Sequence, residues 1–135
     1  MTVQIAHLHA TLCLALAILH IALAFGAPWS SWGPGLDVTQ AAQGDAWAGP
    51  GRPLSPAGRL AAALAVPMLL YLALAIISAA GFPGLGWPRW TGWLAVAVQG
   101  ALAALSLAAR RPVERRLWGP CHVVLTAMAL SVMTA

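Results

Sequence analysis

The stretch from Ala57 to Ala80, AGRLAAALAVPMLLYLALAIISAA, contains a single charged side chain in 24 residues. About 20 consecutive apolar residues make a helix long enough to cross the hydrocarbon core of a bilayer. A helix also pairs its own backbone N–H and C=O groups, which lipid cannot do. The stretch therefore predicts a transmembrane helix.

Three further apolar stretches of similar length cover roughly residues 3–25, 93–109 and 118–135. Hydrophobic residues make up 61% of the chain and charged residues 7%. A soluble domain usually carries about a quarter charged residues, so this composition cannot build a surface that faces water on all sides. We therefore expect an all-α polytopic membrane protein, a bundle of four transmembrane helices that forms a single domain over residues 1–135.

The first connection, Gly26–Pro56, is long and rich in turn-forming residues. It holds six Gly, five Pro and three Trp. Trp29, Trp32 and Trp47 predict a segment that lies at the membrane interface, where amphipathic rings settle. The alternative is a lid or a partner-docking loop, because connections of this length often carry function.

The basic residues, all of them Arg, are distributed unequally between the two sides of the predicted bundle. Six of the seven flank the first or third connection: Arg52, Arg59, Arg110, Arg111, Arg115 and Arg116. The positive-inside rule then predicts that residues 26–56 and 110–117 are cytoplasmic and that both termini lie outside a bacterial inner membrane. The four Arg of the third connection are expected to contact anionic lipid headgroups, and nothing in the sequence supports a nucleic-acid role.

Two histidines are predicted to lie at a similar depth, near the cytoplasmic side. His20 is close to the end of the first helix and His122 is close to the start of the fourth. Two facing imidazoles could ligate a haem or a copper ion. The alternative is that each ring makes a structural hydrogen bond inside the bundle. Cys121 is expected to project about 100° away from His122 around the helix.

Other polar residues in the helices are few. Cys13, Tyr71 and Gln99 are predicted to lie near mid-membrane, where they either hydrogen-bond between helices or line a carrier or channel. His7 and His9 are expected at the outer interface. The predicted helices contain no carboxylate or Lys, which disfavours a proton-coupled carrier.

The third helix repeats small residues at intervals of four, at Gly100, Ala104 and Ala108. Such a face lets two helices approach closely in lipid. Together with the absence of a recognisable catalytic set, it favours a non-catalytic accessory or assembly subunit of a larger inner-membrane complex. Its partner would be another membrane protein or a second copy of the chain, and the sequence indicates no particular cofactor.

Three segments carry a resemblance: LHIALAFGAPW (19–29), GPGRPLSPAGRLAAALA (49–65) and RRPVERRLWGPCHVVLTAMAL (110–130). In these the chain resembles an uncharacterised family of small four-helix bacterial membrane proteins. The resemblance implies a membrane fold and no specific activity. The chain departs from that pattern by the insertion before Gly49 and by Cys121 and His122, which counts against a family-wide site at His122.

Overall fold

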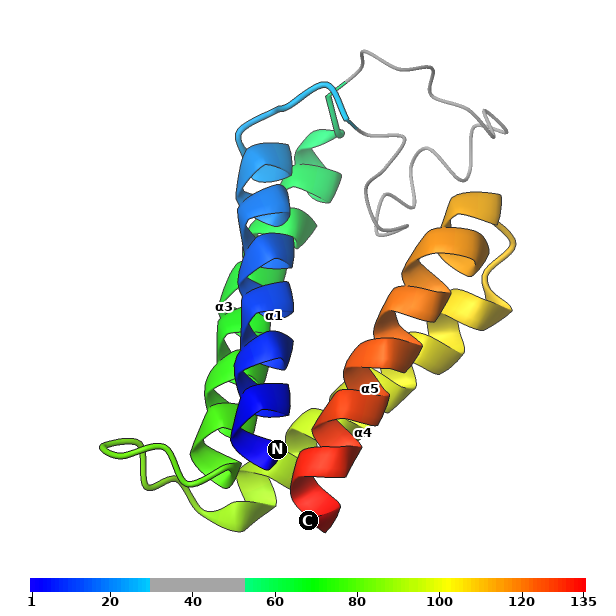
Figure 1. Ribbon diagram of the computed structural model, residues 1–135. Coiled ribbons are helices and arrows are strands. Elements are labelled where there is room, and N and C mark those ends of the chain that lie inside the picture. The colour runs from blue at the N-terminus through cyan, green and yellow to red at the C-terminus, as the bar shows by residue number, and fades with distance from the viewer. Residues whose placement is uncertain (30–52) are drawn as a thin grey trace.

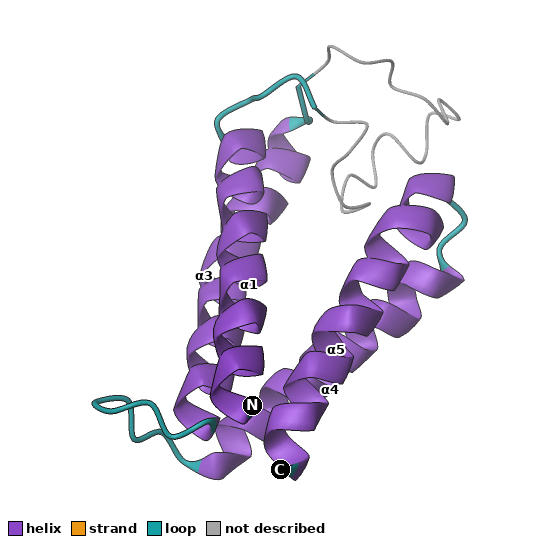
Figure 2. Cartoon of the chain, viewed as in Figure 1, coloured by secondary structure: helices purple, strands orange, loops and turns teal. Residues whose placement is uncertain are grey.

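The computed structural model describes residues 1–29 and 53–135, and within these ranges all regular structure is helical (Figures 1 and 2). The elements are α1 (Thr2–Ala24), α3 (Pro56–Ala79), α4 (Arg89–Ala108), a short π-helix η2 (Glu114–Trp118) and α5 (Gly119–Thr134). Helix η2 runs directly into α5. In the described part of the chain, four segments are long and apolar enough to cross a membrane. The predicted all-α membrane fold is therefore confirmed. Trp32, Trp47 and Arg52 lie outside the described residues.

The helices form two antiparallel pairs. Helix α1 lies along α3, and α4 lies along α5 (Figure 1). The pairs meet at the end that carries both termini and separate toward the other end. The start of α3 and the connection between α4 and η2 both lie at the separated end, so the Arg residues that the structure describes there share one end of the bundle.

An Arg side chain holds each pair together near a helix C-terminus. Arg59 Nε on α3 donates a hydrogen bond to the Ala24 carbonyl oxygen at the end of α1, at 2.8 Å. Arg89 Nη2 on α4 donates to the Met133 carbonyl oxygen near the end of α5, at 2.7 Å. The last carbonyls of a helix have no partner within it, and a cation there also interacts favourably with the helix dipole.

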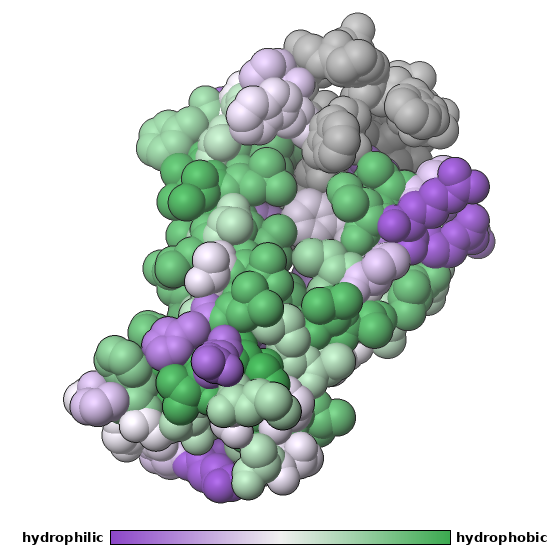
Figure 3. Space-filling view, in the orientation of Figure 1, coloured by the Kyte–Doolittle hydropathy of each residue, from purple (hydrophilic) through white to green (hydrophobic). Residues whose placement is uncertain are grey.

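Large apolar side chains cover much of the outer surface of the bundle. Figure 3 shows hydrophobic side chains over most of the visible face, with strongly hydrophilic ones gathered mainly near its ends. On α1 the buried face consists largely of small residues, while large aliphatic side chains point outward, among them Leu8, Leu12, Leu14 and Ile18. This exposed belt is suited to lipid rather than water.

Two helix starts differ from the sequence-based prediction. Helix α4 begins at Arg89, four residues earlier than expected. Thr91 Oγ1 donates a hydrogen bond to the Pro88 carbonyl oxygen at 2.8 Å and so completes the first turn. The fourth span begins at Glu114 instead of Trp118. Helix α3 begins at Pro56, and the Ser55 side chain accepts a hydrogen bond from the Gly58 amide and caps it.

Candidate functional site

A cavity of about 390 Å³ lies between the two helix pairs, within the size range of small-molecule sites. Most of its wall is aliphatic, contributed by Leu16, Ala65, Met68, Leu69, Leu72, Leu102, Leu105 and Leu125. Its polar lining comes from His20, Gln99, Ser106, Glu114 and His122, with Arg110 and Arg111 at the end where α4 stops. We call it the histidine cavity.

The His20 side chain reaches the cavity from the inner face of α1. Its Nδ1 lies 2.7 Å from the Leu16 carbonyl oxygen, which can only accept, so Nδ1 carries a proton. In the neutral ring Nε2 then has a free lone pair. The ring also makes an edge contact with Trp118, with centroids 5.8 Å apart and planes at 69°.

His122 reaches the same cavity from α5. Its side chain is only 9% exposed, and its ring lies beside that of Trp118 with centroids 5.9 Å apart. Among the described residues its ring nitrogens have no hydrogen-bond partner. The structure therefore brings the two predicted histidines together at one cavity, and it gives His20 a structural hydrogen bond and His122 none.

Glu114 contradicts the prediction that no carboxylate lies inside the helices. It belongs to the fourth membrane-spanning segment, and its side chain is 9% exposed at the cavity wall. Its Oε1 lies 4.0 Å from Arg111 Nη1. The prediction failed because residues 114–118, which look like part of a charged connection in the sequence, form a π-helix that belongs to the fourth membrane-spanning segment. Short π-helical segments of this kind are frequent at functional sites.

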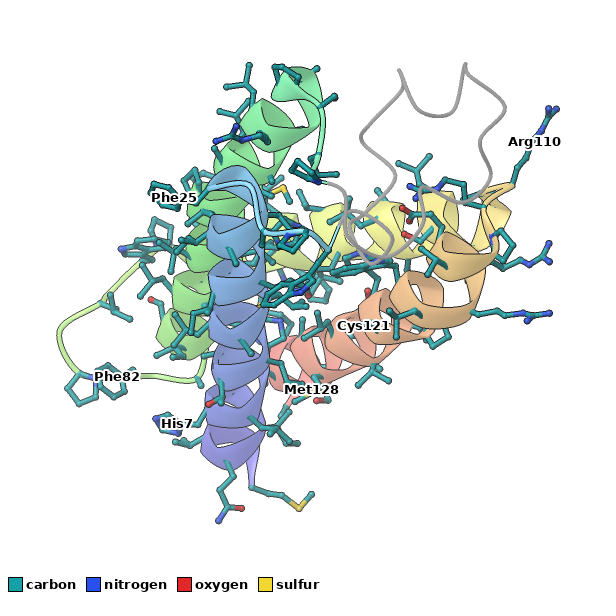
Figure 4. All side chains as sticks on the ribbon, turned by 90° about the horizontal axis from the view of Figure 1, so that it is seen from above. His7, Phe25, Phe82, Arg110, Cys121 and Met128 are labelled. Carbon is teal, nitrogen blue, oxygen red and sulfur yellow. The ribbon has the colours of Figure 1, made fainter. Side chains whose placement is uncertain are left out.

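A second polar group lies deeper, next to the histidine cavity. His9 is completely buried, and its Nε2 lies 2.8 Å from Gln99 Nε2 and 3.2 Å from Gln99 Oε1. Cys13 Sγ is 3.9 Å from both ring nitrogens of His9 and from Gln99 Nε2. The prediction that His9 lies at the interface is therefore wrong. His7 does lie on the outer surface of α1, edge-on to Phe82 at 6.1 Å (Figure 4).

Tyr71 does not join this group. Its hydroxyl donates a hydrogen bond to the Thr91 carbonyl oxygen at 3.2 Å, near the start of α4. Its ring stacks on Trp87 with centroids 5.9 Å apart. Tyr71 therefore links α3 with α4 on the side of the bundle that carries the termini. Of the three residues predicted to line a carrier or channel, Cys13, Tyr71 and Gln99, only Gln99 lines the histidine cavity.

Trp118 separates the histidine cavity from a second, more open cavity of about 530 Å³. The second cavity is lined by Leu16, Leu19, Trp29, Leu117, Trp118 and Cys121. Cys121 thus lines one cavity while the neighbouring His122 lines the other, as the 100° helical step predicts. Trp29, the described member of the three predicted interfacial tryptophans, is exposed.

The remaining predicted interaction surfaces are exposed. Arg110 points away from the bundle (Figure 4), and Arg115 and Arg116 are exposed on η2, where lipid headgroups could reach them. On α4, Ala104 and Ala108 are exposed as well. Contacts of these side chains with lipid, a partner protein or a second copy stay predictions, as does the accessory-subunit function.

Comparison of the chain with models of protein families, with curated proteins and with solved structures gave no match. The resemblance to small four-helix membrane proteins therefore stays a prediction, and the argument about function rests on the geometry of this chain.

Sequence reasoning missed three members of the site. Trp118 follows the Arg cluster directly in the sequence, yet it is 4% exposed and contacts both cavity histidines. Ser106 lies seven residues after Gln99, which is two helical turns, so a search for polar residues on one helix face could have found it. Glu114 gave no such signal, because it is surrounded by Arg.

Proposed function

We propose that this protein binds a small, mainly apolar molecule inside the membrane, in the histidine cavity. The observation that carries the proposal is the buried imidazole of His122, which has no hydrogen-bond partner among the described residues although it faces a cavity. A buried polar group without a partner costs about 1–3 kcal/mol. A ligand with a polar group beside His122 would remove that cost.

His20 supports the same function in a different way. Its Nδ1–H is held by the Leu16 carbonyl, which fixes the ring and leaves the Nε2 lone pair as an acceptor. Histidines that bind metals are commonly held in this way through their other ring nitrogen. The ligand would therefore offer His20 a hydrogen-bond donor or an electrophilic centre.

Among ligands of this kind, a haem is the first to test. In the described residues no group of three or more His, Cys, Asp or Glu side chains is arranged to hold a metal ion. A tetrapyrrole supplies four nitrogen ligands of its own and needs at most two from the protein. Its apolar ring edges would face the aliphatic walls of the cavity.

The test uses the natively purified protein in mild detergent, studied by visible spectroscopy, by titration with haemin and by native mass spectrometry. We expect a Soret band or another bound small molecule in the wild type, lost in His122→Phe. His7→Phe, a change of the same kind at an exposed position on α1, should leave binding intact. A wild type that carries no small molecule and does not bind haemin, or a His122→Phe variant that binds as well as the wild type, would contradict the proposal.

We further propose that the Arg-bearing end of the bundle faces the cytoplasm of a bacterial cell and that both termini lie outside. The support is the positive-inside rule applied to the six Arg on that side. An Arg115→Cys variant without the two native cysteines tests this in intact cells. A membrane-impermeant maleimide should not label it until the membrane is opened, and labelling of intact cells would reverse the assigned orientation.

A further inference from the structure

The buried polar residues of the bundle are gathered in one place. In the described part of the chain seven polar or charged residues are buried, and five of them line the histidine cavity: His20, Gln99, Ser106, Glu114 and His122. The other two are His9, which is hydrogen-bonded to Gln99, and Thr91, whose carbonyl oxygen accepts from Tyr71. The contacts of His9 with Gln99, His20 with Trp118 and Tyr71 with Thr91 each join one helix pair to the other. We call these seven buried polar residues the polar seam.

Within each pair the buried contacts have a different character. Helices α4 and α5 approach closely at two glycines, Gly92 beside Met133 and Gly119 beside Leu107. Polar links inside the pairs include the Arg clamps near the helix ends, made by Arg59 and Arg89. Polar side chains are therefore concentrated where the two pairs face one another. Intramembrane acids and histidines arranged in a row are typical of proton pathways.

The first part of such a pathway would be water in the histidine cavity. Gln99 precedes Arg110 by eleven residues, which corresponds to about 16 Å along the axis of a helix. At about 30 Å³ for each water molecule, the cavity of about 390 Å³ has room for roughly a dozen. Its polar lining provides the hydrogen bonds that buried water requires. Water would thus connect the Arg-bearing end of the bundle with Gln99.

The second part is His9. Its Nε2 faces the Gln99 amide at 2.8 Å, and its ring is fully buried. Imidazole accepts a proton on one nitrogen and releases one from the other near neutral pH. When the Gln99 amide turns aside, a proton can bind to Nε2 of His9 and convert the ring to an imidazolium. The ring becomes neutral again by releasing its Nδ1 proton toward the end of the bundle that carries the termini. Turning of the ring then restores the starting tautomer.

The last part, from His9 to the end that carries the termini, is the narrowest. His9 is seven residues from the start of α1, or about 10 Å. The core around this end includes Ala6 and Ala95, which are 1% and 0% exposed, next to larger side chains such as Met133. This part is closely packed, so water enters it only when the packing opens transiently, and Thr91 and the Tyr71 hydroxyl supply polar atoms at the far side.

We propose that the polar seam conducts protons across the membrane, from the water of the histidine cavity through His9 to the opposite end of the bundle. The proton gradient or the membrane potential supplies the driving force, and no other reactant is consumed. This activity does not depend on the proposed ligand. A ligand in the histidine cavity would displace the water, so the flux assay uses protein that native mass spectrometry shows to carry no bound molecule.

The experiment is a proton-flux assay in liposomes that contain the purified protein and a pH-sensitive dye. A potassium gradient with valinomycin drives the protons. Removing one partner of a buried hydrogen bond leaves the other unpaired, whereas replacing both by apolar groups is nearly neutral for folding. The test variant is therefore the double substitution His9→Leu with Gln99→Leu, and His7→Leu on the outer face of α1 is its control.

We expect the wild type and His7→Leu to conduct at least about tenfold faster than empty vesicles, because uncharged lipid carries few protons and the seam supplies a polar route. The double variant should fall to the rate of empty vesicles. A wild-type rate equal to that of empty vesicles overturns the proposal, and so does a double variant that keeps more than half of the wild-type rate. Native mass spectrometry of the same samples reports ligand binding separately.

Discussion

Gln99 on α4 lies 2.8 Å from the imidazole of His9 on α1, through its amide nitrogen, in the interior of the bundle. The two residues are 90 positions apart in the sequence and belong to different helix pairs. This contact fixes which face of each helix points inward. It also connects the histidine cavity, which Gln99 lines, with the fully buried His9.

Because the His9–Gln99 pair is buried, breaking it should affect stability in a non-additive way. We expect Gln99→Leu alone to lower the free energy of unfolding by about 1–3 kcal/mol, because His9 loses its partner. The double variant with His9→Leu should lose less than the sum of the two single changes. Chemical unfolding in detergent measures all four states of this double-mutant cycle. Strict additivity would show that the two side chains are not coupled.

Gly92 should be sensitive to the addition of a single methyl group. A Cβ at Gly92 would overlap the Met133 sulfur and lie 3.3 Å from Ala79 Cβ. Overpacking of this kind costs about 1–3 kcal/mol. We therefore expect Gly92→Ala to lower the thermal unfolding temperature, and Met133→Ala, which opens a cavity of its own, to cost less in the Gly92→Ala background than in the wild type. Gly100→Ala is the control, because its Cβ would meet Thr126 at an ordinary 3.8 Å.

The Arg89 clamp should contribute to the packing of α4 on α5. Its hydrogen bond to the Met133 carbonyl involves a charged donor, and such bonds contribute about 1.5–3 kcal/mol. Arg89→Leu should therefore destabilise the protein measurably in a detergent unfolding assay. Arg115→Leu is the control, because it removes an exposed Arg that makes no clamp. An equal loss of stability in this variant would point to a general effect of charge.

The four spans could be predicted from the sequence because length and apolar composition alone decide them. The depth of His20 and His122 followed from counting residues along two helices. The inward face of α1 did not follow. In a membrane helix both the lipid-facing and the core-facing residues are apolar, so hydrophobic periodicity does not distinguish the buried His9 from the exposed His7.

Glu114 and Trp118 could not be placed for a different reason. Both lie beside the Arg cluster, and their sequence is typical of a polar connection at the interface. Only the π-helical winding of η2 and its packing against α4 and α5 turn these side chains inward. Tertiary packing of this kind leaves no local pattern in the sequence.

The reactivity of the two free cysteines tests the packing of the bundle without any substitution. Cys13 is 1% exposed among the residues of the core, whereas Cys121 is half-buried and lines the open cavity beside Trp118 (Figure 4). An apolar maleimide should therefore modify Cys121 at least about tenfold faster than Cys13, because local opening of the core is needed to expose the buried thiol. Peptide mass spectrometry of samples taken over time measures both rates. After unfolding in denaturant the two thiols should react alike, and equal rates in the folded protein would contradict the packing of α1 described above.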